Sequence, residues 1–471
     1  MATANVAAVS EPPRTRHLGG GVLAATVAQL ATLGCTAVAS ILIARILGAD
    51  GLGTFAVASN FAGIALLVVG LGIKQGILVL VGSGRWPLRL AASDLTVLVV
   101  ALGLAGVGLV FGAYELLADS ALEPLPSEAV PILAAAVIVG LAWQWSWCLV
   151  LALERYEAYA TVFTAPAVAT LLVSPPLAAA FGVAEAIAGL VVGYAVGAVA
   201  GVWAATRFGA RWRLREGASE RGRRLRSVLG FGIRSWGSEV LRYSNMRLDI
   251  FFVAAYASAA DVGKYSVAVT VSGIGLILPS ALSTAVMPRT ARLSGAAASQ
   301  GAPLVDADLS DARACRHTVL MLPLTAAVVA VLLLVGVPLF YGSEFKDTVE
   351  LGFILLPGVL LLGLSQVMTS IVQGRGRPDY AFYVVLATAP PTAIAYLLVI
   401  PDAGVTGAAI VSVASYAATA LFAYFYFRRA TGIGPRQALV PSRADLRAYK
   451  DVMGMTHEYM RTAFSYVTAR R

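Results

Sequence analysis

Apolar runs about as long as a membrane is thick constrain the fold of this chain more than any other feature. A helix needs roughly 20 apolar residues to cross a bilayer. Hydrophobic residues make up 58% of the 471 and charged residues only 13%, a balance that is not typical of soluble globular chains. The sequence therefore predicts an all-α integral membrane protein with twelve transmembrane helices, at residues 19–44, 52–73, 90–113, 129–153, 158–180, 182–206, 228–257, 262–287, 317–341, 350–373, 380–400 and 404–427.

The distribution of positive charge predicts the orientation of these helices. Most of the 35 Lys and Arg residues fall in alternate connections and in the terminal segments, whereas the other connections are mostly acidic. Because positively charged segments stay on the cytosolic side, we expect a multi-pass protein of the cell (cytoplasmic) membrane with both termini in the cytosol. No outer connection exceeds about fifteen residues. This excludes a large catalytic domain outside the membrane, and we expect no enzyme activity.

The two halves of the chain resemble each other. Gly53-Thr-Phe-Ala-Val-Ala58 matches Gly263-Lys-Tyr-Ser-Val-Ala268 at an offset of 210 residues. Duplicated helical units with a site at their interface are a transporter architecture. We therefore expect two pseudo-symmetric six-helix lobes around a central cavity. The expected segments are a cytosolic tail (1–18), an N-lobe (19–206), a basic cytosolic linker (207–227), a C-lobe (228–428) and a cytosolic tail with an amphipathic helix (429–471).

Two of these segments allow alternatives. The arginine-rich linker either contacts anionic lipid headgroups or only directs topology. After Pro441 the tail has an S-x-x-D helix start at Ser442 and Asp445, followed by apolar residues at helical spacing. This helix either lies on the inner membrane face or docks against the bundle.

A charged stripe marks the seventh apolar run. Charges at hydrocarbon depth face a bundle interior or a watery cavity. At about 100° per residue, one face gathers Arg234, Ser235, Ser238, Glu239, Arg242, Asn245 and Asp249. We assign an anionic substrate group to Arg234, Arg242, Ser238 and Asn245, and ion coupling to Glu239 and Asp249. Alternatively, Arg242 only joins helices by pairing with Glu239 or Asp249. Arg247, on the opposite side, is expected to snorkel to the interface.

Polar residues in other runs allow two interpretations. Lys74 with Gln75 either ends the second helix at the cytosolic surface, which we favour, or points into the cavity as a substrate ligand. Gln366 serves helix packing or binds sugar hydroxyls. Asp94, near the start of the third run, is interpreted as a surface cap.

Tryptophan and cysteine residues add little to the expected site. Three tryptophans cluster in the fourth run and are interpreted as interfacial or packing aromatics, with a sugar-stacking platform as the less favoured alternative; they are Trp143, Trp145 and Trp147. The three cysteines are isolated, so we expect no metal site and no cofactor. The short arginine cluster without interleaved aromatics also makes a nucleic-acid partner improbable.

Several motifs carry a resemblance to a known family. Ile43-Ala-Arg-Ile-Leu-Gly-Ala-Asp-Gly-Leu-Gly-Thr-Phe55 resembles the ARxLGxxGxG signature of polysaccharide and oligosaccharide flippases, in the multidrug/oligosaccharidyl-lipid/polysaccharide exporter superfamily. Phe340-Tyr-Gly-Ser-Glu-Phe345 and Gln373-Gly-Arg-Gly-Arg377 are similar to later landmarks of that family. The likeness spans residues 20–428.

The resemblance implies an alternating-access flippase. It would move a polyprenyl-diphosphate-linked oligosaccharide from the cytosolic to the outer face for polysaccharide biosynthesis. The partners expected are this lipid-linked oligosaccharide, anionic membrane lipids and other polysaccharide-assembly proteins. A multidrug exporter of the same superfamily is the first alternative, although three Arg against one Glu and one Asp in the seventh run favour an anionic substrate. A membrane enzyme acting on lipid-linked sugar is the second.

Overall fold

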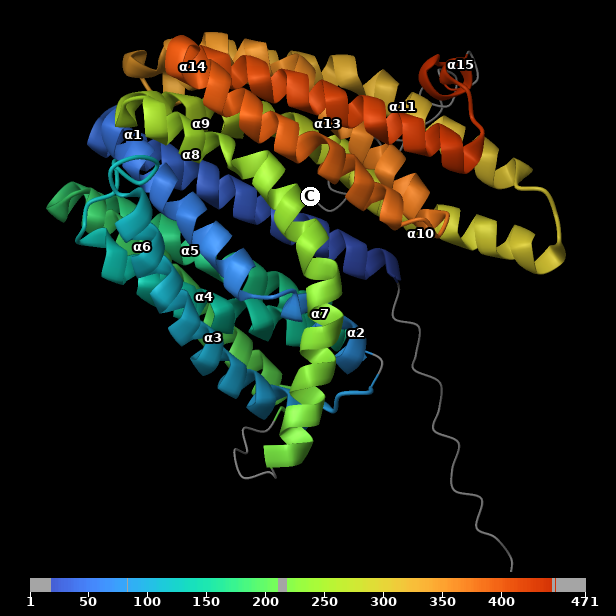
Figure 1. Cartoon of the computed structure of the whole chain (residues 1–471), viewed down its shortest axis with the longest axis horizontal. Coiled ribbons are helices and arrows are strands. Elements are labelled where there is room, and N and C mark those ends of the chain that lie inside the picture. The colour runs from blue at the N-terminus through green and yellow to red at the C-terminus, as the bar shows by residue number, and fades with distance from the viewer. Residues whose placement is uncertain (1–17, 83, 211–217, 443–444, 446–471) are drawn as a thin grey trace, which may run out of the picture.

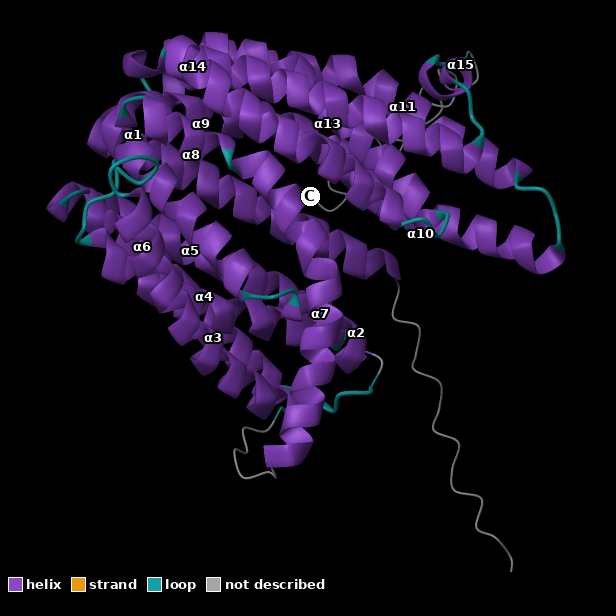
Figure 2. Ribbon diagram, viewed as in Figure 1, coloured by secondary structure: helices purple, strands orange, loops and turns teal. Residues whose placement is uncertain are grey.

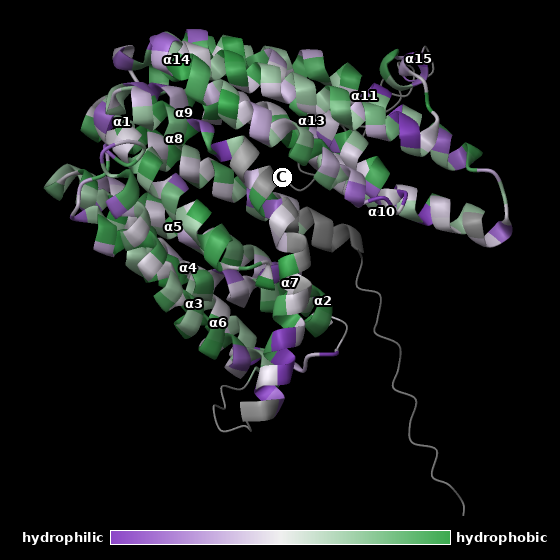
Figure 3. Cartoon of the chain, viewed as in Figure 1, coloured by the Kyte–Doolittle hydropathy of each residue, from purple (hydrophilic) through white to green (hydrophobic). Residues whose placement is uncertain are grey.

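The computed structural model describes residues 18–82, 84–210, 218–442 and 445. Over these residues the chain consists of helices and connections without a strand (Figure 2). Nine helices in this part are long and apolar enough to cross a membrane. Figure 3 shows hydrophobic residues along the helices and hydrophilic ones at the start of α7. The expectations for residues 1–17, for 211–217 and for most of the tail beyond Ser442 fall outside the described residues.

The first half of the chain forms one group of helices (Figure 1). Within it α1 packs on α5, and α4 packs on both α3 and α6. The helices are α1 (Leu18–Val69), α2 (Ile73–Gly82), α3 (Leu88–Leu117), α4 (Ala129–Ala152), α5 (Tyr156–Phe181) and α6 (Val183–Arg207).

The second half forms another group, in which α13 packs on α9, α10, α11 and α14. Its helices are α8 (Asp249–Tyr256), α9 (Ala259–Gly273), α10 (Ile277–Gln300), α11 (Val305–Val331), α12 (Val337–Phe340), α13 (Asp347–Gly374), α14 (Asp379–Thr431) and α15 (Pro435–Leu439). Helix α7 (Ala218–Arg247) runs between the groups and packs on both α2 and α14 (Figure 1). Residues 218–227 of the expected linker 207–227 already belong to α7.

Two glycines break the longest helices, Gly48 in a predicted connection and Gly404 at the first residue of the predicted run 404–427. Gly48 in α1 has φ 69° and ψ −169°, and Gly404 in α14 has φ 55° and ψ −144°. A side chain is strained at such positive φ values, whereas glycine is not. Each glycine therefore lets the chain change direction at a single residue, without a loop.

The two groups meet most closely where α1 crosses α9. A Cβ added at Gly53 would lie 1.8 Å from the Ala259 carbonyl oxygen, and one at Gly263 would lie 2.1 Å from the Ala49 carbonyl oxygen. Ala49 and Ala259 stand at the same offset as the two glycines, so the contact is reciprocal. A local two-fold axis between the repeats would produce this arrangement.

Side chains reinforce this crossing at one end of the molecule. Arg45 Nε donates to the Phe340 carbonyl at 2.6 Å, and the Ala49 amide donates to Glu344 Oε1 at 3.2 Å. We call this end the acidic end, after the exposed or half-buried carboxylates of its longest connection, Asp119, Glu123 and Glu128. The opposite, arginine-rich end carries Arg85, Arg155, Arg207, Arg375 and Arg377.

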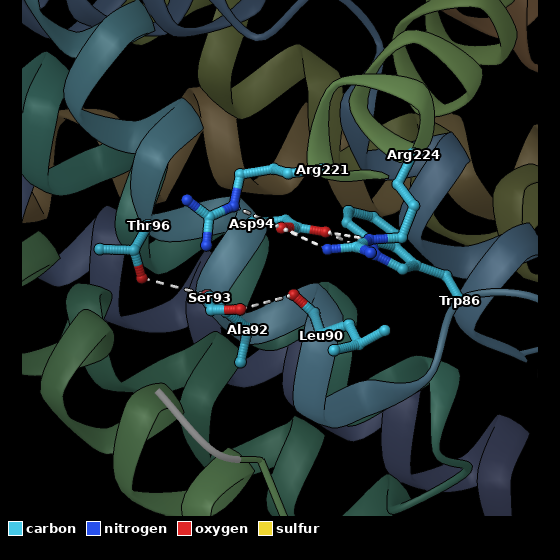
Figure 4. Close-up of polar contacts among 8 residues, drawn as sticks. All are labelled: Trp86, Leu90, Ala92, Ser93, Asp94, Thr96, Arg221 and Arg224. Atoms are coloured by element: carbon cyan, nitrogen blue, oxygen red, sulfur yellow. Dashed lines mark hydrogen bonds and ion pairs between the residues drawn. The ribbon is translucent and has the colours of Figure 1, made fainter. Parts of the chain in front are cut away.

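A buried carboxylate fastens the start of α7 to the first group. Asp94 of α3 is fully buried and accepts from Arg221 Nε at 3.1 Å, from Arg224 Nε at 2.8 Å and from Trp86 Nε1 at 3.2 Å (Figure 4). The interpretation of Asp94 as a surface cap is therefore wrong. Helix α3 begins at Leu88, so Asp94 lies in its second turn and faces α7.

A second ion pair holds the start of the C-terminal tail against α11. Arg316 Nε donates to Asp445 Oδ2 at 2.6 Å, and the Asp445 amide donates to Ser442 Oγ at 3.3 Å. Burial alone would raise the pKa of Asp445, but the hydrogen bonds from Arg316 and Ser442 outweigh burial and lower this pKa. Ser442 and Asp445 therefore lie against the bundle, whereas the predicted amphipathic helix falls outside the described residues and its two alternatives stay predictions.

The α1–α9 crossing gives the first testable prediction. Gly53→Ala adds one carbon that meets backbone, which cannot move aside as a flexible side chain would. We expect the groups to separate at the acidic end. Double electron–electron resonance between spin labels at Glu123 and Lys346, with Cys35, Cys148 and Cys315 replaced by serine, should record a longer distance. Gly34→Ala is the control, because its Cβ would meet nothing within 4 Å. Equal distances in both variants would contradict the tight crossing.

The Asp94 contact gives the second prediction. Asp94→Ala leaves the two guanidinium groups without this carboxylate and should lower the free energy of unfolding by about 3 kcal/mol. Asp379→Ala is the matched control, since Asp379 pairs with Arg377 at an exposed site of the same end and exposed pairs contribute little. Thermal melting in detergent compares the two. Equal melting temperatures for Asp94→Ala and the wild type would refute the structural role.

Candidate functional site

A cavity of about 540 Å³ lies between the two groups of helices. Its walls come from α1, α4, α5 and α6 on one side and from α7, α8, α9, α13 and α14 on the other. Leu52 and Ser266 line it, each within one turn of Gly53 or Gly263. The α1–α9 crossing therefore lies at the boundary of the cavity toward the acidic end.

Matching positions of the two repeats line this cavity. Phe55, Ala56, Ser59 and Asn60 of α1 line it from one repeat. Residues 210 positions later line it from α9, namely Tyr265, Ser266, Val269 and Thr270. The internal repeat was the sequence signal that could have identified these residues, because a site on a two-fold axis takes the same positions from each half.

Aromatic residues form much of the first-group wall. Trp143 of α4 and Tyr194 of α6 both line the cavity and are stacked, with ring centroids 5.3 Å apart and an interplanar angle of 24°. Phe163 of α5 joins them at the cavity. Trp145, in contrast, is 1% exposed within the core, and Trp147 packs edge-on against Phe163. The packing interpretation therefore holds for Trp145 and Trp147, whereas Trp143 faces the cavity.

The opposite wall contains charge. Tyr243, Met246 and Arg247 line the cavity at i, i+3 and i+4 spacing on α7, and Asp249 of α8 lines it too. Arg247 was expected to snorkel away, and this expectation is wrong. The cavity meets the face of α7 that carries Tyr243, Met246 and Arg247, and this depends on how α7 packs against α2 and α14.

Arg247 and Asp249 differ in the partners that their charged groups contact. Arg247 forms no ion pair with any described residue, and its side chain is exposed to the cavity. Asp249 is 4% exposed and accepts from the Tyr265 hydroxyl and from the Ile250 amide, each at 2.9 Å. The Tyr265 hydroxyl lies 3.1 Å from Ser412 Oγ of α14, which extends the network. The guanidinium is thus available to an anionic ligand, whereas the carboxylate is fixed by hydrogen bonds.

Four predicted ligands cannot be placed in the cavity. The backbone of Arg234, Ser238, Arg242 and Asn245 belongs to α7, but their side chains lie outside the described part of the structure. Their assignment to an anionic substrate group stays a prediction, as does the alternative ion pair of Arg242.

Lys74 and Glu239 meet each other away from the cavity lining. Lys74 Nζ and Gln75 Nε2 donate to the two carboxylate oxygens of Glu239, joining α2 to α7. The favoured interpretation, that Lys74 ends the second helix, is wrong. The helix breaks earlier, at residues 70–72, where Leu71 and Gly72 have φ values of 45° and 66°. Lys74 therefore lies in the first turn of α2.

Gln366 also makes a helix contact. Its Oε1 accepts from Ser280 Oγ at 2.9 Å, which joins α13 to α10, and Gln366 does not line the cavity. Of the two roles that the sequence allowed, the structure places Gln366 in helix packing. Within the described residues there is no group of three or more His, Cys, Asp or Glu that could hold a metal ion.

Solved structures similar to this chain are membrane transporters. An outward-facing multidrug resistance MATE family transporter of the MOP superfamily matches with a TM-score of 0.61 and 14% identity, over 88% of this chain and 95% of that one. The lipid II flippase MurJ, in an inward closed conformation, matches with a TM-score of 0.64 and 13% identity, over 87% and 89%. The Vibrio cholerae MATE transporter VcmN in its bent form gives 0.54 and 18%, over 88% and 96%. At these identities the likeness concerns the fold.

Sequence comparisons identify the family. No curated protein matches the chain. The family model described as polysaccharide biosynthesis protein matches residues 42–350, which is more than half of the sequence. This match includes the crossing at Gly53 and Gly263, both repeats of the cavity lining, and Arg247. The chain is therefore a multi-pass membrane protein that belongs to the polysaccharide biosynthesis protein family and shares its fold with transporters of the MOP superfamily.

Proposed function

We propose that this protein is a flippase that moves a polyprenyl-diphosphate-linked oligosaccharide from the cytosolic to the outer face of the cell membrane. The observation that carries this proposal is Arg247, which lines a cavity between two groups of helices and forms no ion pair with a described residue, within a chain of a polysaccharide biosynthesis family. A diphosphate cannot cross hydrocarbon unaided. A guanidinium offers it a charged, planar set of donors.

The proposed topology has twelve crossings in two six-helix lobes. A straight 52-residue helix would extend about 78 Å, far more than the roughly 30 Å of a hydrocarbon core. α1 therefore crosses twice, reversing at Gly48, and α14 does the same at Gly404. Counting α7 with α8 as one further crossing raises nine candidate spans to twelve. Both termini and the arginine-rich end then lie in the cytosol.

In this proposal the cavity opens alternately at its two ends during transport. The acidic end is closed at the α1–α9 crossing, so the headgroup enters from the arginine-rich, cytosolic end. Separation of α1 from α9 then releases it outside. The lipid tail stays in the bilayer while the headgroup moves, because the tail is apolar and needs no protein cavity to remain in the membrane.

Within the site, Arg247 holds the diphosphate and Asp249 is the residue for ion coupling. Arg234 and Arg242 are proposed as further diphosphate ligands, with Ser238 and Asn245 beside them. Lys74, Gln366 and Glu239 are left out of the site, because each bonds to another helix outside the cavity. Asp249 faces the cavity instead.

A flipping assay in proteoliposomes tests the proposal and gives the third prediction. Fluorescent undecaprenyl diphosphate carrying one N-acetylglucosamine should cross only when the protein is present. Arg247→Gln should reduce the rate per folded molecule at least tenfold, a change equivalent to about 1.4 kcal/mol. Arg247→Lys should restore part of it, because an ammonium keeps the charge without the planar fork.

Lys346→Gln is the control for Arg247→Gln, since Lys346 is an exposed cation at the acidic end, outside the cavity. A full rate in Arg247→Gln would exclude the diphosphate role. A wild-type protein that moves a fluorescent organic cation but not the lipid-linked sugar would instead support a multidrug exporter.

A further inference from the structure

We propose that Trp143 and Tyr194 form a saccharide-stacking platform, which holds the sugar of the transported headgroup while Arg247 holds its diphosphate. This inference rests on the proposed function and names the part of the substrate that the aromatic wall recognises. The two rings come from different helices, α4 and α6, and both face the cavity.

The platform is held in place before any ligand binds. Trp143 Nε1 donates to the Val162 carbonyl of α5 at 3.0 Å, which fixes the plane of the indole. Gly197 of α6 gives the indole room, since a Cβ there would lie 2.5 Å from Trp143 Cδ1. Tyr194 then stacks on the indole. A ligand therefore meets a rigid aromatic surface and need not order it.

The indole of this platform offers apolar carbon to the cavity. The only hydrogen-bond donor of an indole is its N–H, and that of Trp143 is taken by α5. The ring faces carry negative partial charge. One face of a pyranose presents C–H groups with positive partial charge, so it complements an aromatic face. A group that needs hydrogen bonds from the indole itself would fit poorly.

The polar groups beside the platform suit hydroxyl donors. Cavity-lining Thr32, Thr36 and Ser59 each donate their hydroxyl hydrogen to a helix carbonyl, at 2.8, 2.8 and 2.6 Å. Each hydroxyl oxygen keeps lone pairs that can accept. Asn60 uses Nδ2 in the same way at 2.8 Å and leaves its Oδ1 as an acceptor. A sugar combines an apolar C–H face with a rim of O–H donors, and it matches both parts of this wall.

The distribution of charge separates the two parts of the ligand. The platform and these acceptors come from α1, α4 and α6, all uncharged at the cavity, whereas Arg247 comes from α7 on the opposite wall. A sugar diphosphate has a neutral end and an anionic end. The cavity therefore orients the headgroup, with its sugar toward the first group of helices and its diphosphate toward α7.

Binding of two probes to the full chain in nanodiscs tests the platform and gives the fourth prediction. The probes are undecaprenyl diphosphate with one N-acetylglucosamine and undecaprenyl diphosphate without sugar. Trp143→Leu should weaken binding of the first about tenfold and leave the second unchanged. Trp143→Phe should lose less, because a ring remains, and Tyr194→Phe should bind as the wild type does. Arg247→Gln should weaken both probes alike.

Trp147→Leu is the matched control, because Trp147 lies in the same aromatic cluster but does not line the cavity. It should leave binding of both probes unchanged. If Trp143→Leu binds the sugar-bearing probe as tightly as the wild type, or loses both probes equally, the platform is refuted while the flippase proposal stands. If the wild type binds neither probe, the proposed function itself fails. Tyr194→Leu repeats the test should Trp143→Leu not fold.

Discussion

The backbone contact between α1 and α9 is the constraint on which the rest of the structure depends. Gly53 and Gly263 allow the two helices to cross without intervening side chains, and small residues are what close helix packing in a membrane requires. The crossing fixes Phe55, Ser59 and Asn60 opposite their counterparts in α9. The cavity therefore takes its shape from a contact that lies outside it.

Most buried charged groups in this molecule are paired, because an unpaired ion away from water is energetically costly. At the arginine-rich end, Asp94 is held by two arginines, and Asp311 accepts from Arg375 Nε at 2.9 Å. Each contact stabilises a fold that a single unpaired ion would weaken. Arg247 departs from this pattern in the described part of the chain, since it lines the cavity without an ion-pair partner. Under the proposed function, the negative charge that pairs with this guanidinium is supplied by the transported ligand.

Sequence reasoning predicted the helices better than the directions of their side chains. The apolar runs could be predicted because a membrane-spanning length of apolar residues leaves a strong local signal. The face of α7 that meets the cavity could not be predicted, because it depends on the packing of α7 against α2 and α14, which helical spacing does not contain. Asp94 and Lys74 were assigned to helix ends because their ion-pair partners could not be recognised in the sequence. These partners lie more than a hundred residues away in the chain.

In the candidate site, too, the kinds of residue were easier to predict than the directions of their side chains. An anion-binding arginine in the seventh run was expected, but the cavity contains Arg247, which the helical wheel placed on the wrong side. Trp143 was noticed without a means of separating it from Trp145 and Trp147, because all three lie within five residues on one helix. Their roles depend on what α5 and α6 place beside them. The internal repeat identifies residues that line the cavity, whereas Arg234, Ser238, Arg242 and Asn245 of the charged stripe stay predictions.

The central claim is that one cavity holds both ends of a lipid-linked sugar headgroup, and a substrate-bound structure tests it most directly. Cryo-electron microscopy of the protein in nanodiscs with undecaprenyl diphosphate–N-acetylglucosamine should show density between the two groups of helices. We expect the diphosphate against the guanidinium of Arg247 and the sugar ring against Trp143. Headgroup density outside this cavity, or a diphosphate bound away from α7, would contradict the account.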